Sequence, residues 1–263
     1  MDSPRNILQI KRVHYPSQHR LWWQKPRSRF ARLIGTSYTI LGQACESPRL
    51  GIKRDSAPAL RLVTPTTVTD IDGNTYNIVI IGTQSWMGEN LKVTRYRNGD
   101  SIPNVLDHIE WETLSFGAYS SYNNDTSLGN SYGFLYNWKV VQDSRKVCPD
   151  GWHVPTDAEW STLINYLGGE SIAGGKLKEK GTSHWRGPNI GATNESLFTA
   201  LPGGYRSPEN REFSSIGGIG YWWSSTDYNL TSAWWRFMSD GSTDVFRGYG
   251  PKRAGFSIRC IRD

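Results

Sequence analysis

The sequence predicts an α+β protein in which two short helices are followed by several short antiparallel strands. One observation is a complete helix-start signal at Thr156, followed by an apolar stripe at helical spacing. Another is a β-hairpin pattern in residues 70–91, and a third is a series of short β-type runs separated by glycine-rich turns in residues 197–263. Helices and antiparallel strands that occupy separate parts of a chain are typical of this class.

The most interpretable segment is CPDGWHVPTDAEWSTLINYLGG, residues 148–169. Thr156 and Glu159 have the spacing of a capping box, in which each side chain accepts a hydrogen bond from the other residue's main-chain N–H. The apolar residues that follow recur at helical spacing, and they are Trp160, Leu163, Ile164 and Leu167. Gly168-Gly169 is suited to end a helix. We therefore predict an amphipathic helix that packs on a core, with Trp152 as a further core anchor.

Two other segments predict regular structure before this helix. In TDIDGNTYNIVIIGTQSWMGENL, Asp72-Gly73 supplies a turn, Thr75–Ile81 a strand, and Gly82-Thr83 a second turn, which together predict a hairpin. The segment YGFLYNWKVV, Tyr132–Val141, has apolar residues three and four apart, so we expect it to form the first helix.

After Gly181 the helical periodicity ends, and short strands are expected through the C-terminal end of the chain. In the last of these, Phe256, Ile258 and Cys260 alternate with more polar residues. This alternation predicts that one face of the strand is buried and that it carries Cys260 inward.

The composition bounds the class of protein. The 263 residues include twelve tryptophans, and 13% of the chain is aromatic, which is enough for a sizeable core. The mean hydropathy is −0.55 and the chain has no long apolar run, which argues against a transmembrane helix but leaves a lipid anchor open.

The positive net charge is concentrated near the N-terminus. The whole chain has 30 basic and 24 acidic side chains, but residues 1–62 alone hold twelve Lys and Arg against three Asp and Glu. The remaining residues therefore carry a net charge of −3, from 18 basic and 21 acidic side chains. A mildly acidic folded part gives no support for a nucleic-acid-binding surface.

Residues 1–63 differ from the rest of the chain by their basic charge, scattered prolines and lack of periodicity. We expect either a disordered arm or a degraded export signal there, followed by one domain over residues 64–263. The basic Arg27–Arg32 precedes LIGTSYTILGQAC, in which Cys45 follows small residues that fit a lipobox poorly. A lipoprotein or secretion signal, an unstructured arm and a start codon placed too far upstream all remain open.

From about Val68 to Asp263 the chain resembles the Fibrobacter succinogenes major paralogous domain, a family common in bacterial surface proteins. The resemblance rests on motifs that occur in the family's order: DIDGNTYNIVIIGTQSWMGENL, IPNV, YGFLYNW, CPDGWHVPTDAEW, YLGG, AGGKLKE, ATNESLFTALPGGYR, GYWWSST and GFSIRC. WHVPTDAEW is also similar to a signature of formylglycine-generating enzymes. The resemblance implies a C-type-lectin-like fold, which agrees with two short helices and several short antiparallel strands.

Three cysteines, Cys45, Cys148 and Cys260, are too few for a disulfide scaffold and have no metal-ligand spacing. The resemblance places Cys148 and Cys260 in segments near the core sheet, which implies a disulfide between them. The alternative is two buried free thiols in a reducing compartment. Neither cysteine lies beside a visible acid–base partner, so catalysis by a cysteine pair has little support.

The segment Tyr221–Lys252 holds more large side chains than short strands can bury on one face, so we expect some of them to be exposed. Exposed Tyr, Trp and Arg side chains are typical of recognition surfaces. In C-type-lectin-like proteins diversified by retroelements, the variable residues lie in this same region. Trp222 and Trp234 are expected in the core. The predicted ligand-binding residues are Tyr228, Asn229, Trp235, Arg236, Met238, Asp240, Asp244, Phe246, Arg247 and Tyr249.

No catalytic motif is apparent in the sequence, and no metal site is predicted from His or Cys spacing. Asn123, Asn124 and Asp125 offer oxygen donors that suit calcium, although a solvated turn is the commoner role of such a sequence.

The sequence therefore predicts a non-enzymatic domain that binds a protein or glycan ligand at a bacterial surface or outside the cell, with no cofactor. Two alternatives remain: an enzyme related to formylglycine generation, and a structural surface domain without a specific ligand.

Overall fold

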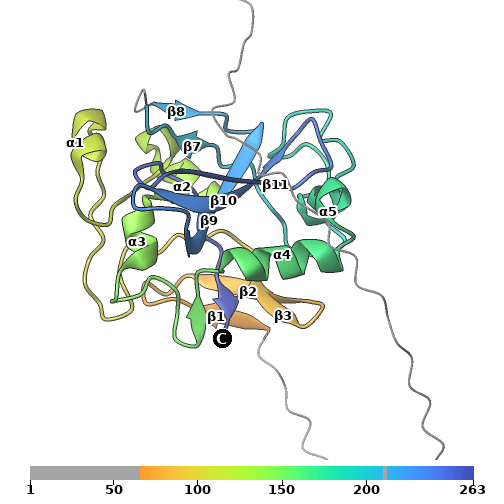
Figure 1. The fold of residues 1–263 in the computed structure, drawn as a ribbon, viewed down its shortest axis with the longest axis horizontal. Helices are drawn as coiled ribbons and strands as arrows, with labels where there is room; N and C mark the ends of the chain where they lie inside the picture. Colours follow the sequence, from red (N-terminus) through yellow and green to blue (C-terminus); the bar gives the residue numbers. More distant parts are fainter. Residues whose placement is uncertain (1–65, 210–211) are drawn as a thin grey trace, which may run out of the picture.

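The computed structural model describes residues 66–209 and 212–263, and its helices and antiparallel sheets confirm the predicted α+β class (Figure 1). The helices of this part are α1 (His108–Thr113), the 3-10 helix η1 (Tyr122–Asn124), α2 (Thr126–Tyr132), α3 (Trp138–Gln142), α4 (Asp157–Tyr166) and α5 (Glu170–Leu177). The strands are β1 (Thr67–Thr69), β2 (Thr75–Ile81), β3 (Gln84–Met87), β4 (Tyr119–Ser120), β5 (Leu135–Tyr136), β6 (Trp152–His153), β7 (Tyr205–Arg206), β8 (Phe213–Ser214), β9 (Ile219–Asp227), β10 (Ser232–Ser239), β11 (Phe246–Pro251) and β12 (Ile261–Arg262). There are more helices than the two predicted.

Residues 1–63, with the possible export signal and Cys45, lie outside the described residues. Among the helices of residues 66–209 and 212–263, none combines the length and the apolar character needed to cross a membrane.

The largest sheet joins the two ends of the described chain. Its strand order is β1-β2-β3-β12-β6, with every pair antiparallel. In β12, Ile261 is paired with Trp86 of β3 on one side and with His153 of β6 on the other. The C-terminal strand is therefore inserted between β3 of the first hairpin and β6, and Figure 1 shows the C-terminus at this sheet. The turns of this hairpin lie where they were predicted, at Asp72-Gly73 and Gly82-Thr83.

Helix α4 is the helix that the capping box predicted. Thr156 Oγ1 accepts from the N–H of Glu159 at 3.2 Å, and Glu159 Oε2 accepts from the N–H of Thr156 at 2.7 Å. The predicted apolar stripe is buried, and Trp160 packs against Trp86 of β3 with ring centroids 4.9 Å apart. Figure 1 shows α4 lying alongside β2 and β3. The local signal was sufficient because both capping bonds form within four residues of sequence.

The prediction of one helix over Tyr132–Val141 is wrong. Tyr132 ends α2, residues 135–136 form β5, and α3 begins only at Trp138. Gly133 ends α2 with a φ of 82°, and the Asn137 side chain caps α3 by accepting from the N–H of Val140 at 3.3 Å. An asparagine that caps a new helix start competes with a continuous helix, and the strand before it also buries apolar side chains. The 3–4 spacing therefore came from a strand followed by a short helix.

Helix α5 was not predicted, because its sequence ESIAGGKL contains two glycines at Gly174 and Gly175. A Cβ atom at Gly174 would meet the Asp244 carbonyl, and one at Gly175 would lie 2.5 Å from the Gly191 carbonyl oxygen. The glycines are required where the main chain of two loops approaches the helix, so packing against those loops outweighs the low helix propensity.

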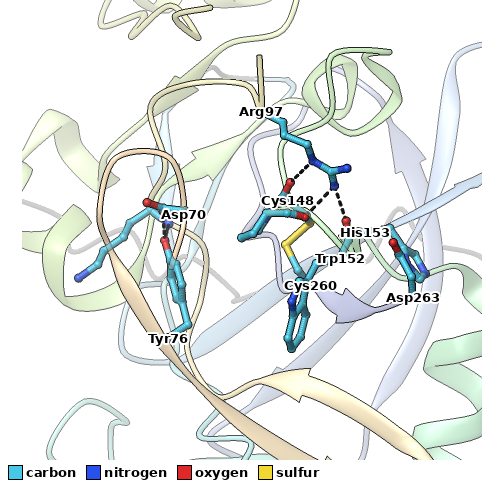
Figure 2. The surroundings of a disulfide bond; sticks show 10 residues. Asp70, Tyr76, Arg97, Cys148, Trp152, His153, Cys260 and Asp263 are labelled. Atoms are coloured by element: carbon cyan, nitrogen blue, oxygen red, sulfur yellow. Dashed lines mark hydrogen bonds and ion pairs between the residues drawn. A yellow bond between two sulfur atoms is a disulfide. The ribbon is translucent and has the colours of Figure 1, made fainter. Parts of the chain in front are cut away.

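Cys148 and Cys260 form the predicted disulfide, with Cα atoms 6.0 Å apart and 112 residues between them in sequence. Both cysteines are buried in the larger apolar cluster of the core. Arg97 holds the chain around Cys148, donating to the carbonyls of Cys148, Pro149 and Trp152 at 3.0, 2.7 and 2.7 Å (Figure 2).

The segment 256–261 is buried on both faces, whereas one buried face was predicted. Phe256, Ile258 and Cys260 are buried as expected, but so are the residues between them, including Arg259. Its guanidinium donates to Asn90 Oδ1 at 2.6 Å and to the carbonyl of Met87 at 3.2 Å. A long arginine can be buried in this way because main-chain carbonyls and an amide accept from it.

Candidate functional site

The sheet of β11, β10 and β9 holds most of the residues predicted to bind a ligand. Its order is β11-β10-β9 and both pairs are antiparallel. Side chains along β10 alternate, so Trp234 and Arg236 lie on one face and Trp235 and Phe237 on the other. Both faces are largely covered by other parts of the chain.

The predicted surface is wrong at three residues of β10. The exposed fractions of Trp235, Arg236 and Met238 are 1%, 0% and 0%. Trp235 belongs to the apolar cluster that contains Phe256, and Met238 belongs to the cluster that contains Trp160 of α4. The prediction treated these large side chains as too many for one core face, whereas two clusters, one on each side of the sheet, bury them.

Phe246 lies apart from the other predicted residues of β11. It stacks on Phe237 with ring centroids 4.4 Å apart and planes inclined by 11°, on the face that carries Trp235. Arg247 is paired with Arg236, and Tyr249 with Trp234, on the opposite face. Phe246 therefore cannot belong to one flat patch with Arg247 and Tyr249, because they lie on opposite faces of the sheet.

The two predicted aspartates lie at the far end of β10 from Tyr228 and Asn229. Asp240 and Asp244 are in the turn that joins β10 to β11, while Tyr228 and Asn229 are in the turn between β9 and β10. Asp240 forms an ion pair with Arg186 at 3.4 Å. The structure therefore does not bring the ten predicted residues together.

A smaller group remains partly exposed at one edge of this sheet, and we define Tyr228, Trp234, Arg247 and Tyr249 as the edge cluster. The rings of Tyr228 and Tyr249 are stacked, with centroids 3.6 Å apart and planes inclined by 10°. Trp234 meets both rings edge-on, at 5.1 Å from Tyr228 and 5.7 Å from Tyr249. A hydrogen bond with the Tyr228 side chain raises the pKa of Tyr249 above its usual value. Trp234 was expected in the core and is instead partly exposed, whereas Trp222 is buried as expected.

Arg247 joins the edge cluster to helix α4. Its guanidinium carbon lies 3.6 Å from the centroid of the Trp234 ring, and its Nη2 donates to Asp157 Oδ2 at 2.7 Å. Asp157, the first residue of α4, also accepts from Arg236 Nη1 at 2.7 Å. Burial alone would raise the pKa of Asp157, but hydrogen bonds from Arg247 and the charge of Arg236 hold it below its usual value. Arg247 is thus fixed from two directions, by the Trp234 ring and by the carboxylate.

The turn before β10 presents an apolar side chain that the sequence analysis did not select. Asn229 Oδ1 accepts from the N–H groups of Thr231 and Ser232 at 3.0 and 2.8 Å, which fixes the turn. Leu230 at its tip is 95% exposed. A single exposed leucine is common on protein surfaces, so exposure alone does not mark Leu230 as a binding residue. Its position beside Tyr228 is the reason to consider it.

A second residue that sequence reasoning missed is Lys178, which follows α5 and is fully buried. Its Nζ donates to the carbonyls of Ile190, Ser239 and Ser242 at 3.0, 2.8 and 2.8 Å. Burial lowers the pKa of Lys178 to about 8. The three bonds join the end of β10 and the β10–β11 turn to the loop at Ile190, a role for which a lysine in AGGKLKE gives no sequence signal.

The loop considered for calcium carries a helix cap. Asp125 Oδ1 accepts from the N–H and Oγ of Ser127 at 2.8 and 2.7 Å and so caps α2. The Asn124 amide donates to the carbonyl of Leu106 at 3.1 Å. Within residues 66–209 and 212–263, no group of three or more His, Cys, Asp or Glu side chains is arranged to hold a metal ion.

Comparison with known proteins adds the family. Neither the curated proteins nor the solved structures gave a significant match to this chain. The profile of the Fibrobacter succinogenes major domain matches residues 79–262, which include the α4 capping box, the disulfide and the whole of β9, β10 and β11. The chain therefore belongs to the Fibrobacter succinogenes major domain family.

Proposed function

We propose that this protein is a non-enzymatic recognition domain, displayed at a bacterial surface or secreted, that binds a protein or glycan ligand through the edge cluster and Leu230. The observation that carries the proposal is the stack of Tyr228 on Tyr249, with Trp234 against its side. Tyr228 is 43% exposed, and the other two aromatic residues are partly exposed.

Aromatic side chains that are both exposed and held in place are suited to binding. Tyr and Trp give a large contact area, and a ring that is already fixed by its neighbours loses little conformational entropy when a ligand binds. Arg247 and Lys252 already have partners in Asp157 and Asp227, so the charges around the rings are largely matched. A neutral ligand with an apolar or planar group suits this surface better than a highly charged one.

The disulfide supports export. Reducing conditions in the cytoplasm keep most thiol pairs open, so a buried bridge that closes a loop of more than a hundred residues is typical of an exported protein. A C-type-lectin-like arrangement and attachment through a lipid anchor remain part of this proposal.

The alternative of an oxidative enzyme has less support. Cys148 and Cys260 are bonded to each other and are 2% and 0% exposed, so neither sulfur is placed to meet a substrate. Turnover of a peptide thiol by the purified protein, with copper or calcium added, would overturn the recognition proposal.

The test is a combined glycan and protein array probed with the full chain and with Tyr228→Ala and Tyr249→Ala. We expect each variant to weaken binding by about tenfold or more, as is usual for an aromatic hot spot. Tyr166→Ala is the matched control, because Tyr166 is also an exposed tyrosine, at 66%, but lies on α4. Equal loss in all three variants, or none in any of them, would contradict the proposed surface.

A further inference from the structure

Among the residues that the structure describes, no strand pairs with the outer edge of β11 next to the edge cluster. In an antiparallel ladder the N–H and C=O of one residue point to the same side, and successive residues point to opposite sides. The N–H of Lys252 donates to the carbonyl of Thr231 at 2.9 Å, in the same register as the β10–β11 pairs. The main-chain N–H and C=O groups therefore face β10 at Phe246, Gly248 and Gly250. At Arg247 and Tyr249 these groups face outward.

The opposite edge of the same sheet, formed by β9, differs from the edge of β11 because it is hydrogen-bonded along its length. On β9, the N–H of Trp223 donates to Ser257 and the N–H of Ser225 donates to Pro155, at 3.1 and 2.8 Å. The carbonyls of Ile219 and Tyr221 accept from Gly204 and Ser257, at 2.9 and 3.0 Å.

Within the described residues, the outward-facing main chain of β11 is paired at its two ends. The N–H of Val245 donates to the Glu170 carbonyl of α5 at 2.8 Å, and the carbonyl of Pro251 accepts from the N–H of Ala254 at 2.9 Å. Between them, no residue of the described chain accepts from the N–H of Arg247 or Tyr249 or donates to their carbonyls through the main chain. Pro251 also faces outward but has no N–H, and edge strands often carry proline there.

We infer that the ligand of this protein is an extended polypeptide segment of a partner protein, which adds as a short strand to the open edge of β11. The inference rests on the proposed function and specifies its ligand class. Main-chain donors and acceptors in strand geometry are matched by another extended main chain, and pairing of this kind is a recurrent mode of peptide recognition. The unpaired stretch between the bonds to Glu170 and Ala254 limits the added strand to about three to five residues.

The edge cluster then selects the side chains of that segment. Tyr249 and Arg247 project from the open strand, and Tyr228 and Trp234 flank them on the same side. Peptide residues at alternate positions would lie over these rings, so an aromatic or apolar residue at every second position is expected.

The experiment selects peptides from a displayed library of random linear nonapeptides on the full chain, and then measures binding of the synthetic peptides. Tyr249→Pro is compared with Tyr249→Ala. Both variants lose the ring, but only proline removes the outward N–H, and the ladder to β10 does not use that N–H. We expect the proline variant to bind about tenfold more weakly than the alanine variant, which corresponds to one main-chain hydrogen bond.

A second measurement does not depend on the folding of any variant. Each peptide is N-methylated at one residue at a time, and we expect binding to be lost at alternate positions and kept at the positions between them, because a paired strand uses every second N–H. Amide exchange of the wild-type chain should be fast at Arg247 and Tyr249 without peptide and slow with it.

Several results would overturn the inference. These are N-methylation effects without a period of two, unchanged exchange at both amides on binding, amides already protected in the free chain, and a dimer of this chain that Tyr249→Pro dissociates. If the array shows a glycan ligand that depends on Tyr228 and Tyr249 and no peptide is selected, the recognition function stands and the polypeptide assignment fails.

Discussion

Arg247 donates hydrogen bonds to both carboxylate oxygens of Asp157. Its Nε lies 3.0 Å from Oδ1 and 3.1 Å from Oδ2, and its Nη2 lies 2.7 Å from Oδ2. Asp157 begins the helix that the sequence marks most clearly, and Arg247 belongs to the strand that carries the candidate site. The same carboxylate accepts from the buried Arg236, so one side chain connects the core, the helix start and the edge cluster.

Asp157→Asn should destabilise the protein strongly. It leaves the guanidinium of Arg236, which is 0% exposed, without its anionic partner, and loss of one member of a buried pair costs about 3–5 kcal/mol. Urea-induced unfolding measures the free energy. Asp150→Asn is the control, because Asp150 pairs with Arg97 at an exposed position and its loss should change the free energy by less than about 1 kcal/mol. Similar costs for the two variants would contradict a special role for Asp157.

The contribution of Asp157 should depend on pH in the acid range. Because its pKa in the folded protein lies below the usual value of 3.8, the folded state favours the carboxylate. This contribution is fully present above the unfolded-state pKa and is lost as pH falls below it through the folded-state pKa. The difference in unfolding free energy between wild type and Asp157→Asn should be constant from pH 5 to 7 and shrink below about pH 4. A difference that stays constant down to pH 2 would contradict the ion pairs.

Trp235→Ala and Tyr228→Ala should separate the core from the surface of the β9–β11 sheet. Trp235 is buried among aromatic side chains, so its truncation should cost about 3–5 kcal/mol, as should that of Trp160. Tyr228 is partly exposed, and its truncation should cost about 1 kcal/mol or less. Thermal and urea unfolding of the three variants check this order, and a Trp235→Ala variant as stable as wild type would place that residue on the surface after all.

The disulfide should be present in protein purified without reductant. Alkylation after denaturation should label one cysteine, Cys45, and labelling after reduction should reach all three, as counted by mass spectrometry. Cys260→Ser should lower stability by roughly 4–5 kcal/mol, since the bridge closes a loop of 112 residues in the unfolded chain. Two or three labelled cysteines before reduction would contradict both the bridge and the argument for export.

The site could be predicted only in part. Tyr228, Arg247 and Tyr249 lie together as expected, but Trp235, Arg236, Met238 and Phe246 do not join them. Alternation along a strand assigns residues to two faces, but it does not say whether a second layer covers each face. Here both faces of β10 meet apolar clusters, so exposure is restricted to one edge of the sheet and to the turn at Leu230.

The sequence by itself determined what depends on neighbouring residues. The capping box of α4 and the turns of the first hairpin form among residues a few positions apart, so their side chains and glycines specify them directly. The motifs shared with the family were sufficient to imply the bridge between Cys148 and Cys260. Tertiary structure alone decided α5, whose glycines are required by the approach of distant loops, and the division of YGFLYNWKVV into a strand and a helix. It also decided which aromatic residues reach the surface, because burial depends on residues far away in sequence that pack on each face of a strand.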